Sequence, residues 1–331
     1  MLRLPPLSTL RPTSLAEATA ALGSAPPPRI LGGGTDLVPS LKLGLGGAAA
    51  LQLLSVEGLG LAGIEQRDGA WTLGAATPLW DLIRWKPAGA LGAISEAARS
   101  IAAPPIQSRA TLGGNLCLDT RCFHYNQSTF WRSSRPVCFK AGGDVCHVAP
   151  GGNRCFACHQ ADLPPVLIAL GASADIRGAR GPRTVPVEAL YTGDGRAPLS
   201  LAPDELLAGV SVPTPPKGAG AGWEKIRMRK GLDFAVASAA AYVELGADGK
   251  CTAARVVLGA LGSGPIRVTE AEEALVGSSA LDETLLEKVG AAARAAARPM
   301  KNVDLTPAYR KKVAGVAAKR AVEKAWATAK G

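Results

Sequence analysis

Six of the seven cysteines and all three histidines of this 331-residue chain lie between Leu116 and Gln160. Four of the five phenylalanines lie in the same stretch, whereas the rest of the chain is rich in Ala, Leu, Gly and Val. Thiols that are concentrated together with aromatic side chains are typical of a metal or iron–sulfur site with its own apolar surroundings. The sequence on either side of this stretch resembles one interrupted module, so we interpret residues 116–160 as an insert.

The composition is that of an ordinary globular protein. Hydrophobic residues make up 47% of the chain and charged residues 19%, and the length is sufficient for two or three domains. No apolar run is long enough to span a membrane, and the N-terminal residues lack the apolar core of a secretory signal. We therefore expect a cytoplasmic protein with no membrane partner, in a compartment where clustered cysteines bind metals more often than they form disulfides.

The net charge of +10 is unevenly distributed along the chain. Residues 301–331 hold eight Lys or Arg and two acidic residues, and the spacing from Tyr309 to Trp326 suits an amphipathic helix. Such a run of charge is usually a solvated helix face, and the docking of a partner subunit is the alternative. The run has no interleaved aromatic residues and no nucleic-acid motif, so the sequence predicts no nucleic-acid partner.

Local signals predict an α+β protein with two domains. Ser14 and Glu17 form a capping box that begins a helix, and residues 29–31 are expected to form a strand that stops at a glycine-rich turn. The Pro/Gly-rich residues 216–222 are the best candidate for a linker. They separate a first domain of residues 1–215, which has two subdomains and is interrupted by the insert, from a C-terminal α+β domain of residues 223–331.

Two glycine-rich segments are candidates for binding a phosphate-containing ligand. The first, Gly32-Gly33-Gly34-Thr35-Asp36, lies between a predicted strand and a predicted helix; the second, from Ala110 to Asn115, supplies a hydroxyl, two glycines and an amide. Glycines let the backbone approach a diphosphate, and N–H groups at the start of a helix favour anionic oxygens. The first segment alone is weak evidence, because glycine-rich turns are common and its spacing is neither that of a Rossmann fingerprint nor that of a Walker loop.

Both segments in this order make the chain resemble the flavin-binding subunits of the xanthine oxidase family of molybdenum hydroxylases. The resemblance covers essentially the whole chain, including the segments Thr72–Leu82 (TLGAATPLWDL), Ala161–Ala172 (ADLPPVLIALGA) and Leu206–Pro213 (LLAGVSVP). It implies that residues 1–215 are the two-part FAD-binding module of the medium-subunit type, that residues 223–331 are the C-terminal α+β domain, and that the chain binds FAD.

The same resemblance implies which residues hold FAD. The first glycine loop would wrap the diphosphate, the second segment would form another wall, and an aspartate would bind the ribityl and adenosine region. A leucine and a lysine would lie near the isoalloxazine ring. In chain order these residues are Leu31, Gly32, Gly33, Gly34, Thr35, Asp36, Leu37, Thr111, Gly114, Asn115, Asp162, Leu207 and Lys225. An exposed lysine on a strand is the alternative interpretation of Lys225.

The insert closely resembles the one in the flavin subunits of 4-hydroxybenzoyl-CoA reductases, which carry an extra [4Fe–4S] cluster. By matching positions, its ligands would be Cys122, Cys138, Cys146 and Cys155. Four thiolates suit either a cubane cluster or tetrahedral zinc, and a zinc site that uses the close pair Cys155 and Cys158 is the alternative. We interpret Cys117 as a packing residue and Cys158 as a packing or spare residue, and the three histidines as surface or hydrogen-bonding residues.

These resemblances imply an electron-transfer subunit of a larger oxidoreductase. Its partners would be a molybdenum-cofactor subunit and a [2Fe–2S] subunit in a duplicated heterotrimer, with ferredoxin or another electron carrier as the donor. Reductive dehydroxylation of an aromatic thioester would take place on the partner, because this chain shows no catalytic constellation of its own. The alternatives are the flavin subunit of a xanthine- or heterocycle-oxidising molybdenum hydroxylase and a zinc-stabilised scaffold without redox activity.

Overall fold

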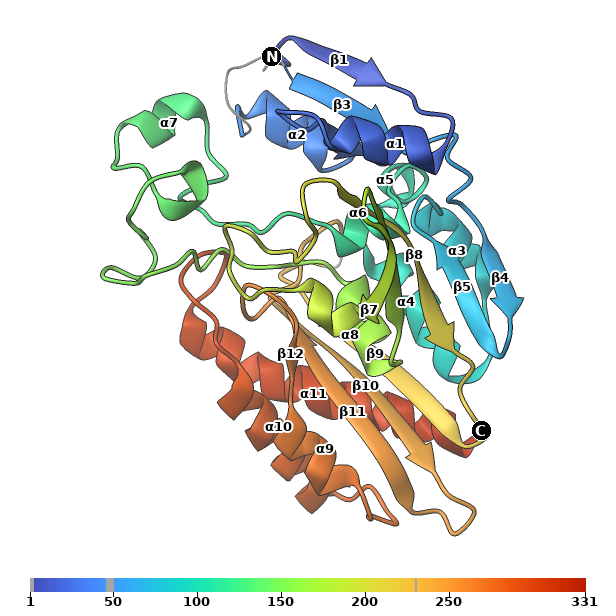
Figure 1. Ribbon diagram of the computed structural model, residues 1–331. Helices are drawn as coiled ribbons and strands as arrows, with labels where there is room; N and C mark the ends of the chain where they lie inside the picture. Colours follow the sequence, from blue (N-terminus) through green and yellow to red (C-terminus); the bar gives the residue numbers. More distant parts are fainter. Residues whose placement is uncertain (1–2, 46–50, 230) are drawn as a thin grey trace.

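The computed structural model describes residues 3–45, 51–229 and 231–331, which form three sheets with their helices and a projecting insert (Figure 1). A small N-terminal layer lies beside a central five-stranded sheet, and a C-terminal four-stranded sheet lies on the other side of the central part. Helices and strands are therefore mixed as the sequence predicts for an α+β fold. Across these three ranges, every helix is too short or too polar to traverse a bilayer.

The N-terminal layer is a three-stranded parallel sheet in the order β1-β3-β2 with two helices. The predicted capping box forms in part: the Ser14 hydroxyl accepts a hydrogen bond from the Glu17 N–H at 3.2 Å, whereas the Glu17 carboxylate accepts one of 2.8 Å from the Thr13 N–H, one residue before the N-cap. Strand β2 leads directly into the first glycine segment and so fixes where that loop begins. The elements are β1 (Leu7–Leu10), α1 (Leu15–Leu22), β2 (Arg29–Leu31), α2 (Leu37–Lys42) and β3 (Leu51–Ser55).

The central sheet is antiparallel, in the order β4-β5-β8-β6-β7. Its strands are β4 (Ile64–Arg67), β5 (Ala70–Gly74), β6 (Ser173–Gly178), β7 (Gly181–Pro186) and β8 (Glu205–Pro213). The helices around it are α3 (Leu79–Trp85), η1 (Gly89–Leu91), α4 (Gly92–Ser100), α5 (Pro104–Gln107), α6 (Leu112–Leu116), α8 (Leu163–Ala169) and η3 (Val187–Leu190), and the insert adds α7 (Thr129–Ser133) and η2 (Phe139–Ala141).

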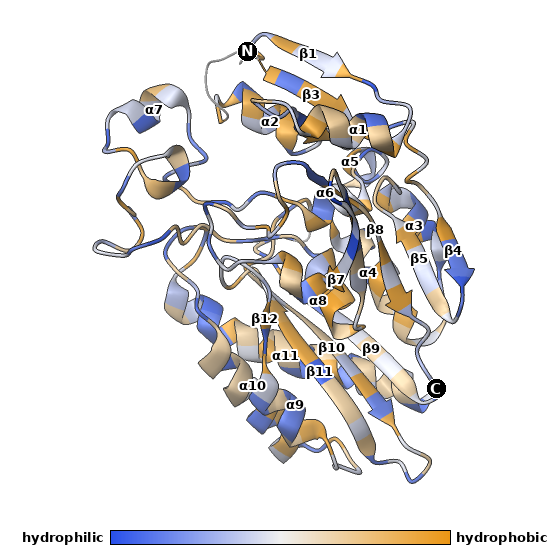
Figure 2. Cartoon of the chain, in the orientation of Figure 1, coloured by the Kyte–Doolittle hydropathy of each residue, from blue (hydrophilic) through white to orange (hydrophobic). Residues whose placement is uncertain are grey.

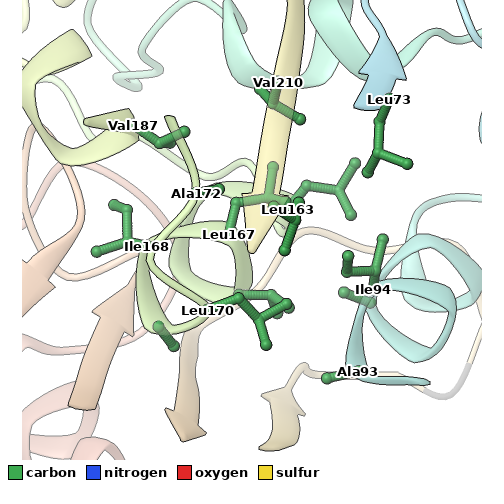
Figure 3. Close-up of a cluster of buried hydrophobic side chains, with 14 of the residues drawn as sticks. Leu73, Ala93, Ile94, Leu163, Leu167, Ile168, Leu170, Ala172, Val187 and Val210 are labelled. Carbon is green, nitrogen blue, oxygen red and sulfur yellow. The ribbon is translucent and has the colours of Figure 1, made fainter. Parts of the chain in front are cut away.

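Helix α8 lies at the centre of the largest hydrophobic core, and all seven of its residues are buried. Leu163 and Leu167 gather with Val210 of β8, Leu73 of β5 and Ile94 of α4 (Figure 3). Burying each such leucine stabilises the fold by about 1.5–3 kcal/mol. This packing fixes the position of α8, and with it the residue at its N-terminus, Asp162.

An ion pair between the partly exposed Arg183 and the buried carboxylate of Glu205 joins the strands β7 and β8. Arg183 donates two hydrogen bonds of 2.7 Å to the carboxylate of Glu205, and the Ala202 N–H donates a third of 2.8 Å. The bonds from Arg183 are the main cause that lowers the pKa of Glu205 from 4.5 to about 2. Because the folded-state pKa is depressed, the pair contributes its full stabilisation above pH 4.5 and loses it as the pH falls toward 2.

We expect Glu205→Gln to lower the free energy of unfolding at pH 6 and to make it fall less steeply between pH 5 and pH 3 than in the wild type, since the neutral amide cannot be protonated in this range. Urea unfolding at several pH values measures both effects. The matched control is Glu57→Gln, which changes an exposed carboxyl group and should leave the pH profile unchanged. If the free energy of unfolding of Glu205→Gln falls between pH 5 and pH 3 as steeply as that of the wild type, this pair does not govern the pH dependence.

The C-terminal domain is an antiparallel sheet in the order β12-β11-β10-β9, covered by three helices (Figure 1). The hydrophobic core of this domain is formed mainly by Ala, Val and Leu side chains of β10, β11 and the helices. The apolar stretches of these strands are orange in Figure 2. The elements are β9 (Ala219–Ile226), β10 (Ala237–Leu245), β11 (Cys251–Gly259), β12 (Ile266–Arg267), α9 (Thr269–Leu275), α10 (Glu283–Ala296) and α11 (Pro307–Lys330).

Part of the expected linker 216–222 is a buried strand, because β9 begins at Ala219. A Cβ atom on Gly220 or Gly222 would overlap the backbone carbonyl of Ala325 or Ala321, so helix α11 lies directly on this strand. The glycines therefore allow close helix–strand packing and do not provide flexibility. On the other face of β9, Trp223 is buried in the core of the FAD-binding half and donates a hydrogen bond of 3.2 Å to the Ser100 hydroxyl.

The basic C-terminal helix uses several of its charges inside the chain. Lys319 pairs with Glu283 of α10 at 2.9 Å, and Lys324 pairs with Glu96 of α4 at 2.8 Å. Arg320 pairs with Glu224 of β9 at 3.1 Å. Pairs of this kind contribute only about 0–1 kcal/mol each when exposed, but here they connect α11 to three other elements of the same chain.

Candidate cofactor sites

A cavity of about 720 Å³ lies between the N-terminal layer, the central sheet and the base of the insert. Its size is within the range of roughly 300–1,000 Å³ that is usual for ligand pockets. Of the thirteen residues predicted to hold FAD, the described structure leaves only Leu31 out of the wall, and Leu31 ends β2 with its side chain beside Gly34. The twelve that line the cavity are Gly32, Gly33, Gly34, Thr35, Asp36, Leu37, Thr111, Gly114, Asn115, Asp162, Leu207 and Lys225.

The two glycine segments touch through their backbones. A Cβ atom on Gly33 would overlap the carbonyl group of Arg109, and one on Gly32 would lie 2.8 Å from the Thr111 hydroxyl. The Thr111 hydroxyl in turn accepts a hydrogen bond of 3.1 Å from the Gly114 N–H. Gly34 has a φ of +72°, which a residue with a side chain adopts only with strain. Together these residues form a wall of bare backbone that a diphosphate can approach closely.

Asn115 and Asp162 connect the second glycine segment to helix α8 and to the C-terminal domain. The Asn115 side-chain oxygen accepts a hydrogen bond of 3.1 Å from the Leu163 N–H. The Asp162 carboxylate pairs with Lys225 at 2.5 Å, and the lysine also donates a hydrogen bond of 3.0 Å to the Ser100 carbonyl. Both side chains of the pair are 5% exposed. Lys225 is thus a buried residue of the cavity wall, and the alternative of an exposed strand lysine is wrong.

The buried pair leaves one acceptor free at the cavity. The Oδ1 atom of Asp162 is buried and has no hydrogen-bond partner among the described residues. Burial raises the pKa of Asp162, and the ammonium group of Lys225 opposes that rise. A buried carboxylate oxygen without a donor is costly unless a ligand supplies one. The bare backbone wall and this free acceptor fit a dinucleotide whose diphosphate and hydroxyl groups complete the hydrogen bonding.

Removing one member of this pair should be more damaging than removing both. We expect Asp162→Asn to destabilise the chain by about 3–5 kcal/mol, because it keeps the size of the side chain but leaves the Lys225 ammonium buried without a counter-ion. The double variant Asp162→Asn with Lys225→Met should recover most of that loss. Urea unfolding of the two variants and the wild type makes the comparison, and a single variant as stable as the wild type would contradict the prediction.

The insert contributes a cavity residue that the sequence analysis did not single out. Arg121 pairs with Asp36 of the first glycine loop, and its guanidinium group lies 4.7 Å from the ring centre of Phe234. Arg121 and Phe234 both line the cavity. No sequence signal marks the contact between Arg121 and Asp36, since 85 residues separate them. The cavity wall therefore includes the residue that directly precedes the predicted cluster ligand Cys122.

The four cysteines predicted to hold a cluster form one electrostatic group. Burial is the main cause that raises the pKa of Cys122 to about 11, and the neighbouring thiols of Cys155 and Cys138 act in the same direction. The pKa of Cys155 is raised by burial and by the thiols of Cys146 and Cys138. Cys122 and Cys155 are buried beside Tyr125 and other apolar side chains, whereas Cys138 and Cys146 are half-buried. Four free thiols with an apolar shell are a donor set that fits an iron–sulfur cluster.

Across the residues that the structure describes, no three His, Cys, Asp or Glu side chains converge closely enough to hold a metal ion. Cys158 does not join the group, because its sulfur lies 3.6 Å from a guanidinium nitrogen of Arg310.

The remaining sulfur and imidazole groups lie near but outside the four thiols. Cys117 lines the flavin cavity. The rings of His124 and His147 lie 5.3 Å apart, and His147 bonds to the Pro136 carbonyl at 2.9 Å. His159 is buried against Tyr191, and burial lowers its pKa to about 4.

Comparison with known families accounts for nearly the whole chain. Residues 5–215 match the FAD binding domain in molybdopterin dehydrogenase, and residues 224–325 match the CO dehydrogenase flavoprotein C-terminal domain. The unmatched residues between the two domains, 216–223, are the end of the connection that follows β8 and the first five residues of β9.

Individual relatives match this chain over most of their length. The chain is 32% identical to the carbon monoxide dehydrogenase medium chain of Afipia carboxidovorans, over 97% of this chain and 96% of that one. It is 31% identical to subunit alpha of the 6-hydroxypseudooxynicotine dehydrogenase complex of Paenarthrobacter nicotinovorans, over 90% and 86% of the two chains. A chain of reconstituted CO dehydrogenase from Oligotropha carboxidovorans superposes with a TM-score of 0.78 at 30% identity, over 98% of this chain and 99% of that one. The chain therefore belongs to the FAD-binding subunits of the molybdenum hydroxylases, a family of oxidoreductase flavoproteins.

Proposed function

We propose that this chain is the FAD and [4Fe–4S] electron-transfer subunit of a molybdenum-containing 4-hydroxybenzoyl-CoA reductase. In that enzyme the phenolic hydroxyl group is removed reductively, with electrons from ferredoxin, on a molybdenum-cofactor subunit. A [2Fe–2S] subunit completes the unit, which is duplicated. The family of the chain supports the flavin part of this proposal, and the insert supports the cluster and the reductase.

The observation that carries the proposal is that the predicted cluster ligand Cys122 directly follows a residue of the flavin cavity wall. Arg121 lines the cavity and pairs with Asp36 there, and the next residue, Cys122, belongs to the group of four thiols. The insert is thus part of the cavity wall and is not a separate element on the protein surface. A second redox centre at these thiols would be close enough to work together with the flavin.

When bound, FAD supplies the exchange of electron pairs for single electrons, and the cluster supplies single-electron transfer. The residues of the chain hold and shield these groups. The backbone of the glycine segments is arranged for the diphosphate, and Asp162 offers its free oxygen to a hydroxyl group. Tyr125 and Phe139 pack against Cys122 and Cys155 and reduce the access of water.

The cavity between the insert and the N-terminal layer supports an electron carrier as the donor. This cavity of about 900 Å³ is lined by Cys138 and by the cationic residues Arg3, Lys42, Arg132, Arg135 and Lys140, and its described lining contains no Asp or Glu. Lys140 pairs with Asp119 at 2.7 Å, so the other four supply most of the positive charge. Phe130 on α7 is 89% exposed beside it. A cationic surface with an exposed aromatic residue suits an acidic carrier protein such as a ferredoxin.

The test is to purify the native complex without oxygen and to determine its flavin, iron, zinc and molybdenum, together with its substrate range. The proposal expects FAD, about four irons per copy of this chain beyond those of the [2Fe–2S] subunit, and reduction of 4-hydroxybenzoyl-CoA with a low-potential donor. Stoichiometric zinc without additional iron would mean that the insert has a structural role and carries no redox centre.

The flavin subunit of a xanthine- or heterocycle-oxidising hydroxylase is the second candidate. It is favoured by the relatives that match over nearly their full length, among them a subunit of a 6-hydroxypseudooxynicotine dehydrogenase complex. A complex that contains FAD and the additional iron but oxidises a heterocycle, and does not reduce the aromatic thioester, would establish this candidate instead.

A further inference from the structure

Cys122 and Cys155, the two buried members of the predicted ligand set, are followed by residues that bond to the C-terminal domain. The Cys155 carbonyl also accepts a hydrogen bond of 3.0 Å from the Gly195 N–H of the FAD-binding half. Residues 300–302 connect α10 to α11 and lie against the base of the insert. At this base, Arg121 and Cys158 pair as two short antiparallel segments, with N–H to carbonyl hydrogen bonds of 2.8 and 2.7 Å. The two entrance segments of the insert are therefore joined to each other before the chain reaches the thiols.

Asn302 contacts both of these segments. Its backbone carbonyl accepts a hydrogen bond of 2.8 Å from the Phe123 N–H, and its side-chain amide donates one to the Phe156 carbonyl. Phe123 directly follows Cys122, and Phe156 directly follows Cys155. Asn302, which is only 2% exposed, thus bonds to the residues that follow Cys122 and Cys155.

Arg310 fixes the orientation of Asn302. The guanidinium group is fully buried and donates to the Asn302 side-chain oxygen at 3.4 Å and to the Met300 carbonyl at 3.0 Å. Its other donors bond to the carbonyls of Val236 and Ala260 and to the sulfur of Cys158. With its oxygen occupied by Arg310, the amide can present only its N–H₂ group to the insert.

We infer that Asn302, oriented by Arg310, is a positioning residue that sets the separation of Cys122 and Cys155 and thereby the geometry of the cluster site. The inference rests on the proposed function, because it concerns the ligands of the proposed cluster. Hydrogen bonds to groups behind metal ligands commonly control the affinity of a site by about 10- to 100-fold. Cys122 and Cys155 directly precede the two residues that bond to Asn302, so they are the ligand pair that these hydrogen bonds hold in place.

Two substitutions separate positioning from a general role in stability. Asn302→Leu removes both side-chain hydrogen bonds. Asn302→Asp keeps the shape and the bond from Arg310 but turns the donor toward Phe156 into an oxygen that repels the carbonyl. The matched control is Asp282→Ala, which removes the N-cap of α10 in the same domain, where the carboxylate accepts a hydrogen bond of 2.8 Å from the Leu285 N–H.

Each variant is purified as the native complex, and the release of iron to a ferrous chelator is followed together with the low-temperature paramagnetic resonance of the reduced cluster. The relevant resonance is the one that Cys122→Ala abolishes. Both Asn302 variants should release iron about 10- to 100-fold faster than the wild type and shift this resonance, with FAD retained, whereas Asp282→Ala should behave as the wild type in both measurements.

The possible results distinguish this inference from the proposed function. If the wild-type complex contains no iron beyond that of its partners, both the proposed cluster and the positioning role of Asn302 are overturned. If the wild type contains the cluster but both Asn302 variants keep the wild-type release rate and resonance, only the positioning role is overturned. It is also overturned if Asp282→Ala accelerates iron release as much as the Asn302 variants, since the effect then follows from stability alone.

Discussion

Gly33→Ala should weaken FAD binding and lower the flavin content of the purified chain, although the substitution adds only one methyl group. The Cβ atom would overlap the carbonyl group of Arg109, and a backbone group cannot rotate away as a side chain can. The two glycine segments would have to separate, which widens the wall on which the diphosphate is expected to lie. Overpacking of this kind costs about 1–3 kcal/mol, so FAD affinity should fall by roughly 5- to 150-fold.

The measurement is the flavin absorbance of the purified chain and the dissociation constant for added FAD. Gly92→Ala is the matched control, since a Cβ atom there meets only the Pro87 carbonyl, at an ordinary distance of 3.4 Å. It should retain wild-type flavin. A Gly33→Ala protein with full flavin content would mean that this part of the wall does not contact the cofactor.

Cys122→Ala and Cys155→Ala should each lose the cluster and keep FAD. Both thiols are buried at the base of the insert, and neither lines the flavin cavity in the described structure. A cubane that has lost one of its thiolates is no longer held at all four corners. We therefore expect the iron content to fall by about four atoms per chain, while the flavin absorbance of the purified complex changes little.

Two other cysteines provide the controls for this prediction. Cys251 is buried in the C-terminal core, so Cys251→Ala creates a comparable cavity without touching the insert and should leave the iron unchanged. Cys158→Ala should have a much smaller effect on iron than the two ligand substitutions, because Cys158 faces Arg310. Equal loss of iron from Cys158→Ala would show that the ligand set is wrong.

The sequence was most informative where the backbone itself dictates the residue type. Gly32 and Gly33 must lack a side chain because another segment of backbone lies against them, and a requirement of this kind is visible in one sequence. Lys225 was predicted from its place in the family pattern, and its burial against Asp162 explains why a lysine is found there. The predicted α+β fold was also confirmed, because many strands and helices follow local sequence signals.

The remaining features depend on contacts between distant parts of the chain. Gly220 and Gly222 suggested a flexible linker, because composition cannot distinguish a mobile loop from a strand on which a helix packs closely. The contacts of Arg121 with Asp36 and of Asn302 with Phe156 join residues separated by 85 and 146 positions. No periodicity or motif reports such pairs, so a single sequence does not reveal them.

The close packing of α11 on β9 also has a consequence for how the protein is made. Alternate residues of a strand face opposite sides, so Trp223 faces the FAD-binding half while Gly220 and Gly222 face α11. The first face can be covered as soon as β9 leaves the ribosome. The second must wait for residues 321–325, which at 5–20 residues per second means roughly 5–20 s. During this interval the newborn chain exposes an uncovered apolar sheet, the kind of surface that chaperones bind.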